Sequence, residues 1–113
     1  MASECLFCRI VRKEIPAAIV AENAHCIAFR DINAQAPVHV LVIPRAHIAT
    51  VNEVTDYAVV AQMHALAALV VTAEGIGSRG FRMVINTNDD GGQTVFHLHM
   101  HVLGGRRMSW PPG

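Results

Sequence analysis

The spacing of apolar residues predicts one long and one short helix. Between Asp56 and Glu74 the apolar side chains recur three and four positions apart, which is the spacing of one face of an α-helix. They are Val59, Val60, Met63, Leu66, Ala67, Val70 and Val71. Thr55 is the expected N-cap, and Gly75 or Gly77 the expected end. A shorter amphipathic helix is expected from Cys5 to Glu14, because Pro16 cannot continue it.

Shorter apolar runs predict about five strands. They are Ala18–Ala21, Cys26–Asp31, Val38–Ile43, Phe81–Thr87 and Phe96–Leu103, and the first two are expected to form a hairpin. The run Val38–Ile43 is apolar on both faces except at His39, which is typical of a covered strand in the middle of a sheet. Strands interspersed with two helices, without a βαβ repeat, predict an α+β fold with an antiparallel sheet and helices on one face. Residues 88–94 are expected to form a polar loop.

Composition limits the classes of partner. The chain has 113 residues, which we interpret as one domain spanning 1–113. Its formal net charge is zero, so we expect no nucleic-acid or anionic-membrane partner. The longest apolar stretch, Ala58–Ala73, is interrupted by Gln62 and His64 and is not expected to span a membrane. The first twelve residues show no secretory signal, so the expected location is the cytoplasm.

Three histidines alternate with apolar residues near the end of the chain. His97, His99 and His101 share one face of the expected strand, opposite Leu98, Met100 and Val102. One reading is a half-buried strand whose polar face is histidine. A single metal ion cannot join all three, because the outer two lie roughly 13 Å apart on a straight strand. The third reading uses imidazole as nucleophile and proton carrier, a chemistry suited to attack on phosphorus.

The cysteines indicate a second kind of chemistry. Cys5 and Cys8 have the Cys-x-x-Cys spacing of a metal or redox pair, which fits a reducing compartment better than a structural disulfide does. Cys26 is expected to be a small buried apolar residue.

These segments together resemble the histidine-triad (HIT) family. The pattern His97-x-His99-x-His101 resembles its signature, and Asn86 and the segment Gly91–Thr94 precede it. Residues 5–17, 29–32, 35–39 and 103–113 are similar to the Hint branch of that family. The family pattern usually has Ser at the position of Thr94, so the hydroxyl is retained.

The resemblance implies a purine nucleoside phosphoramidase that cleaves the P–N bond of adenosine 5′-phosphoramidates and releases AMP. It implies that His99 is the nucleophile and carries the nucleotide, with His39 as a proton-relay partner. We expect His97 to orient His99, and His101 to contact the phosphate or the leaving group. The resemblance also implies that the carboxylate of Asp31 contacts the ribose hydroxyls. The remaining nucleotide contacts would be Ile10, Phe29, Ile32, Asn86, Gly92, Gln93 and Thr94.

The resemblance also implies a zinc ion and a homodimer. Zinc-binding members of the wider family have a ligand set similar to Cys5, Cys8, His47 and His97, whose thiolates and imidazoles suit tetrahedral Zn²⁺. Hint-like proteins pair through the long helix and an edge strand, and residues 104–113 would reach the partner's active site. Three alternatives remain open: a nucleotide-binding regulatory module with little turnover, a zinc-stabilised structural domain, and a dinucleoside polyphosphate hydrolase.

Overall fold

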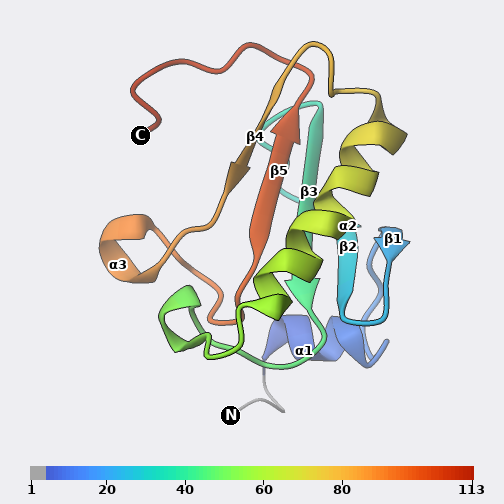
Figure 1. Ribbon diagram of the computed structural model, residues 1–113, viewed down its shortest axis with the longest axis vertical. Helices are drawn as coiled ribbons and strands as arrows, with labels where there is room; N and C mark the ends of the chain where they lie inside the picture. The colour runs from blue at the N-terminus through green and yellow to red at the C-terminus, as the bar shows by residue number, and fades with distance from the viewer. Residues whose placement is uncertain (1–4) are drawn as a thin grey trace.

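The fold is built around one antiparallel sheet with the strand order β1-β2-β3-β5-β4 (Figure 1). The computed structural model describes residues 5–113. The strands are β1 (Ile19–Glu22), β2 (Cys26–Arg30), β3 (Val38–Pro44), β4 (Phe81–Val84) and β5 (Met100–Gly104). The expected hairpin, the central place of β3 and the α+β class are confirmed.

The long helix α2 (Ala58–Glu74) and the short helix α1 (Leu6–Val11) are also confirmed. Two single turns, η2 (Val51–Glu53) and α3 (Asn88–Gly91), were not expected. Helix α2 ends at Gly75, whose φ of 68° is a left-handed conformation that glycine adopts without strain. Thr55 is not its N-cap: Tyr57 holds that position, and the Asp56 side chain accepts a hydrogen bond from the N–H of Ala58 at 3.0 Å.

The two helices cover opposite faces of the sheet, so the prediction that both lie on one face was wrong. Strand β2 alternates its side chains between two separate apolar clusters. Cys26 and Ala28 pack with the residues of α2, whereas Ile27 and Phe29 pack with Phe7 of α1. Since successive side chains of a strand point to opposite faces, α1 and α2 must lie on different sides. In Figure 1, α2 crosses the sheet while α1 lies at the lower ends of the strands.

The last strand begins later than expected. We predicted it from Phe96, but β5 begins at Met100, because the chain before it bonds outside the sheet ladder. The N–H of Leu98 donates to the carbonyl oxygen of Ile48 at 2.6 Å, and the carbonyl oxygen of His97 accepts from a side chain. The alternation itself is retained: Leu98, Met100 and Val102 are buried in the cluster under α2, away from the three histidines.

Strand β4 ends at Val84, three residues before the expected end at Thr87. Cys26 is fully buried as expected, and burial raises the pKa of its thiol to about 11. No helix within residues 5–113 is both long and apolar enough to cross a membrane.

Candidate functional site

A cavity of about 550 Å³ lies between α1 and the sheet. Its apolar wall comes from α1 and β2, through Leu6, Phe7, Ile10 and Phe29. Its polar end is formed by the side chains of Asp31, His39, Thr94, His99 and His101. An apolar wall facing a few convergent polar groups is the usual form of a small-molecule site.

His99 is held in one orientation by the chain beside it. Its Nδ1 lies 2.7 Å from the carbonyl oxygen of His97. A carbonyl oxygen only accepts, so Nδ1 carries the proton and donates it. In the neutral ring, Nε2 therefore keeps its lone pair. The edge-to-face contact with Phe7, at 5.2 Å between ring centroids, supports the buried ring from α1. The arrangement leaves Nε2 as a nucleophilic atom.

His101 is oriented by a chain of hydrogen bonds that starts at the backbone. The N–H of Gln35 donates to Nδ1 of His39 at 3.0 Å, so the proton of His39 is on Nε2. That Nε2 lies 2.9 Å from Nδ1 of His101 and donates to it. The proton of His101 is therefore on its own Nε2. His39 thus bonds directly to His101, whose ring in turn lies 5.1 Å from that of His99.

Burial keeps this pair of histidines neutral. Desolvation lowers the pKa of His39, and the nearby Asp31 carboxylate, 3.3 Å from Nε2, opposes the shift only in part. The pKa of His101 falls to about 4, first through desolvation and then through the charges of His99 and His39. At neutral pH, His101 is therefore a neutral donor.

Asp31, His39 and His101 also place one ligand atom each within 4.8 Å of the others, a spacing that a metal ion could bridge. The hydrogen bonds argue against this use. A cation would need the lone pair of His39 on Nε2, yet the backbone N–H of Gln35 already requires that lone pair on Nδ1. We therefore interpret these three residues as a hydrogen-bonded group.

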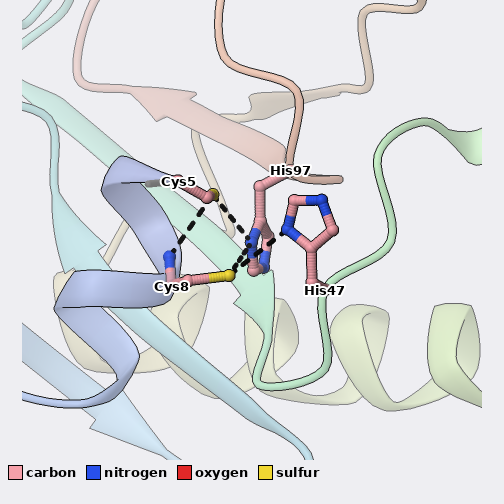
Figure 2. Close-up of side chains that lie close together, drawn as sticks. All are labelled: Cys5, Cys8, His47 and His97. Atoms are coloured by element: carbon pink, nitrogen blue, oxygen red, sulfur yellow. Dashed lines mark hydrogen bonds between the residues drawn. The ribbon is translucent and has the colours of Figure 1, made fainter. Parts of the chain in front are cut away.

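A second group of side chains, none of which lines the cavity, lies close together and fits a metal ion (Figure 2). The ligand atoms of Cys5, Cys8, His47 and His97 all lie within 4.8 Å of one another, and the structure thus brings together all four residues expected to bind zinc. We call this group the Cys/His cluster. Nδ1 of His97 lies 3.4 Å from Sγ of Cys5 and 3.5 Å from Sγ of Cys8, and Nδ1 of His47 lies 3.3 Å from Sγ of Cys8.

Those separations match a tetrahedral metal site. Zinc bonds of about 2.3 Å to sulfur and about 2.0 Å to nitrogen place neighbouring S and N ligands about 3.5 Å apart. The ring of His97 also has the required tautomer, because its Nε2 donates to the carbonyl oxygen of Pro44 at 2.8 Å and leaves the lone pair on Nδ1. Burial lowers the pKa of His97, which keeps the ring neutral as a ligand must be.

Local structure supplies the two thiols. Cys5 is the N-cap of α1 and its Sγ accepts from the N–H of Cys8, so the first helical turn brings both sulfurs to one side. Desolvation is the largest cause that raises the pKa of the Cys8 thiol, and the neighbouring Cys5 adds to it. A bound cation would reverse this preference, since a metal favours the thiolate. The Cys/His cluster can therefore hold a metal, and binding would release the thiol protons.

The loop of residues 88–94 was expected to contact a nucleotide, but several of its polar groups form hydrogen bonds within the protein. The N–H groups of Gly92 and Gln93 donate to the carbonyl oxygens of Asp89 and Asn88. The Gln93 side chain bonds the N–H of Asn88 and the carbonyl oxygens of Ala49 and Val95. Gly92, Gln93 and Asn86 are not among the residues that line the cavity, whereas Thr94 is. The role of these three toward a nucleotide stays a prediction.

The other expected nucleotide contacts line the cavity: Ile10, Phe29, Asp31, Ile32, Thr94, His99 and His101. Sequence reasoning missed Phe7, which touches both His97 and His99. Its position between Cys5 and Cys8 was the available signal. It also missed Gln35, whose contribution comes from its backbone N–H and so leaves no trace in residue type.

Comparisons with known proteins agree with this geometry. Residues 12–108 match the family model described as the HIT domain. The chain is 47% identical to the purine nucleoside phosphoramidase of Escherichia coli K12 over 108 residues, which cover 94% of this chain and 91% of that protein. It is 50% identical to an uncharacterized HIT-like protein of Synechocystis over the whole of both chains.

Solved structures show the same fold. The crystal structure of a HIT family hydrolase from Legionella pneumophila superposes with a TM-score of 0.94 at 50% identity, covering 97% of this chain and all of that one. A HIT family hydrolase from Clostridium thermocellum superposes with a TM-score of 0.91 at 44% identity, covering 94% of each chain.

Proposed function

Because this chain belongs to the HIT family, we propose that it hydrolyses purine nucleoside 5′-phosphoramidates through a nucleotidyl-histidine intermediate on His99. The observation that carries the proposal is the bond from Nδ1 of His99 to the carbonyl oxygen of His97, which leaves Nε2 as the nucleophile at the cavity. The 47% identity to the E. coli purine nucleoside phosphoramidase supports the substrate class.

The cavity offers a distinct contact for each part of a nucleotide. The purine base would lie against the apolar wall of Ile10, Phe29 and Ile32. The carboxylate of Asp31 would accept hydrogen bonds from the two ribose hydroxyls. The α-phosphate would then lie at His99, within reach of the Thr94 hydroxyl and of the Nε2–H of His101.

In the first step, Nε2 of His99 attacks the α-phosphorus and forms an N–P bond while the P–N bond of the substrate breaks. The leaving nitrogen takes up a proton from solvent and departs as an amine. The His99 ring becomes positively charged, and the carbonyl oxygen of His97 stabilises that charge at Nδ1. His101, as a neutral donor, contacts a phosphate oxygen or the leaving nitrogen without a proton having to be lost from its ring.

In the second step, a water molecule attacks the same phosphorus. The bond to His99 breaks, Nε2 recovers its lone pair, AMP is released and the water gives up one proton. This proton balances the one taken up by the amine, so the net reaction is phosphoramidate plus water to AMP plus amine. His39 acts in both steps through His101, to which it is bonded at 2.9 Å.

We further propose that the Cys/His cluster binds zinc. Zinc suits two thiolates and two imidazoles at these separations, whereas cations that prefer oxygen ligands do not. When bound, it would supply structural cross-linking between α1, the loop after β3 and the segment that leads into β5. Elemental analysis of protein purified under reducing conditions without added metal should find about one zinc per chain, and a content far below that contradicts this assignment.

The activity is tested with adenosine and guanosine 5′-phosphoramidates as substrates. We expect AMP or GMP and free amine in equal amounts. A nucleotidylated protein should be found when the first turnover is quenched in alkaline denaturant, because a P–N bond survives base and hydrolyses in acid. Peptide mapping should place the nucleotide on His99. A protein that binds AMP but releases no amine would be a binding module and would refute the proposal.

A further inference from the structure

His97 connects the Cys/His cluster to the nucleophile. Its ring is fully buried and bonds on both sides, with Nδ1 facing the sulfurs of Cys5 and Cys8 and Nε2 donating to the carbonyl oxygen of Pro44. Its backbone carbonyl oxygen is the acceptor for Nδ1 of His99. Whatever fixes the position of His97 therefore also fixes the acceptor that orients His99.

Helix α1 forms a second connection between the same two places. Phe7 lies between the two cysteines in the sequence, and its ring has edge-to-face contacts with His97 at 6.0 Å and with His99 at 5.2 Å between centroids. The same helix supplies Leu6, Phe7 and Ile10 to the wall of the cavity. One face of α1 thus belongs to the Cys/His cluster and another to the nucleotide cavity.

Neither connection is rigid by itself. Helix α1 has six residues, which is too short to be stable from its own backbone bonds. Apart from the Phe7 ring, the contacts that join it to His97 and His47 are thiol–imidazole contacts of 3.3 to 3.5 Å, and a thiol is a weak partner in a hydrogen bond. Four metal–ligand bonds would replace these with fixed lengths and angles.

We propose that a metal bound at the Cys/His cluster positions the nucleophile, acting through His97 and Phe7, and so couples metal binding to nucleotide binding in the adjacent cavity. The inference rests on the proposed role of His99 as the nucleophile. His97 and Phe7 are positioning residues in this arrangement. Metal loading and nucleotide binding would then each strengthen the other.

His47 offers a clean test. It is exposed and contributes Nδ1 to the Cys/His cluster, but it does not line the nucleotide cavity. His47→Ala thus removes a metal ligand without removing a nucleotide contact. His64→Ala is the matched control, because His64 is an exposed histidine of α2 outside the Cys/His cluster. Zinc content, far-UV circular dichroism, the Kd for AMP by calorimetry and the imidazole nitrogen NMR signals of His99 are measured for both.

Coupling between two binding sites typically changes affinity by about 5–150-fold, and we expect a loss of AMP affinity of about tenfold in folded His47→Ala protein. The His99 signals should change from a single Nδ1–H tautomer to a mixture. His64→Ala should match the wild type in every measurement. Wild-type AMP affinity and an unchanged His99 tautomer in zinc-depleted His47→Ala protein would overturn the proposal.

A second measurement uses the wild-type protein alone, in case His47→Ala does not fold. A chromophoric chelator competes for the zinc with and without saturating AMP, while circular dichroism and the His99 signals are followed in the folded fraction. By reciprocity, AMP should tighten zinc binding by the same factor of about ten. An equal zinc affinity in both conditions contradicts the coupling. If the coupling is present but no phosphoramidate is cleaved, the role of His99 as the nucleophile fails, and the coupling between metal and nucleotide binding stands.

Discussion

Arg106 donates from Nε to the carbonyl oxygen of Gln35 at 2.9 Å, and the N–H of the same Gln35 donates to His39. The segment that follows β5 therefore holds the loop that fixes the tautomer of His39, and through it that of His101. Farther along, Arg82 donates to the carbonyl oxygen of Ser109 and lies 5.9 Å from the ring of Trp110. In Figure 1 this tail leaves the upper end of β5 on the side of β4.

Replacing Arg106 with Ala should weaken this support for His39 and His101, the histidines proposed to act in catalysis. A hydrogen bond of this kind contributes about 0.5–1.5 kcal/mol to stability, so Tm should fall by several degrees. We also expect kcat to fall by up to roughly tenfold, because His39 and His101 are held less firmly. Steady-state kinetics with adenosine 5′-phosphoramidate measures the effect. Arg107→Ala, at the exposed neighbouring position, is the control and should stay within twofold of the wild type. If the two variants have equal kcat values, the hydrogen bond from Arg106 to Gln35 does not contribute to turnover.

Replacing His99 with Ala should abolish turnover and leave AMP binding largely intact, because the apolar wall and Asp31 remain. Loss of a nucleophile lowers kcat by at least about 10³-fold, whereas losing the hydroxyl of Thr94 or the ring of His101 should cost less. Turnover is followed by amine release and binding by calorimetry. Near-normal turnover in His99→Ala protein would favour a metal-activated water as the nucleophile.

Acid should destabilise the fold partly through His101. Its pKa is about 4 in the folded protein and 6.5 in the unfolded chain, so between these values the unfolded chain binds more protons. Stability should therefore fall as pH drops below about 6.5 and continue to fall toward pH 4. Urea unfolding at pH 7 and pH 5 should show this loss in the wild type and a smaller loss in His101→Gln protein. If both proteins lose the same free energy of unfolding, titratable groups other than His101 cause the acid destabilisation.

Replacing Cys8 with Ser should remove a metal ligand and lower stability. Changing a residue that only supports a ligand typically costs about 10–100-fold in metal affinity. Loss of the ligand itself should therefore cost at least about 1.4–2.8 kcal/mol, which lowers Tm by roughly 10 °C or more in a chain of this size. Thermal unfolding and elemental analysis are measured together. Cys26→Ala is the comparison, because Cys26 is fully buried and lies outside the Cys/His cluster. It should lose stability by leaving a cavity while its zinc content stays the same.

The proposed homodimer would use exposed apolar side chains. Leu69 of α2 is 60% exposed, and Phe81 on the edge strand β4 is 38% exposed. An interface that covers them would bury an apolar surface that water now contacts. Light scattering at micromolar concentration should report a dimer for the wild type and a monomer for Leu69→Glu. As a control, Arg79→Glu introduces the same side chain in the loop that connects α2 to β4, and this variant should remain dimeric. A monomeric wild type contradicts the proposal.

The sequence by itself determined the elements and the chemical groups. The 3.6-residue period of α2, the buried run of β3 and the alternation from Leu98 to Val102 each follow from local patterns, because one face of each element must be buried. The Cys-x-x-Cys spacing and the three neighbouring histidines likewise identified candidate chemistry before any fold was known. Resemblance to the HIT family then joined residues that no local pattern connects.

Only the tertiary structure decided how these groups divide between two sites. His97 leaves the row of three histidines to join Cys5, Cys8 and His47, while His99 and His101 turn into the cavity. That division depends on the place of α1 opposite α2 and on backbone partners such as the carbonyl of Pro44 and the N–H of Gln35. Every residue carries a backbone carbonyl, and every residue except proline an N–H, so the sequence holds no local signal for which of them will orient a side chain.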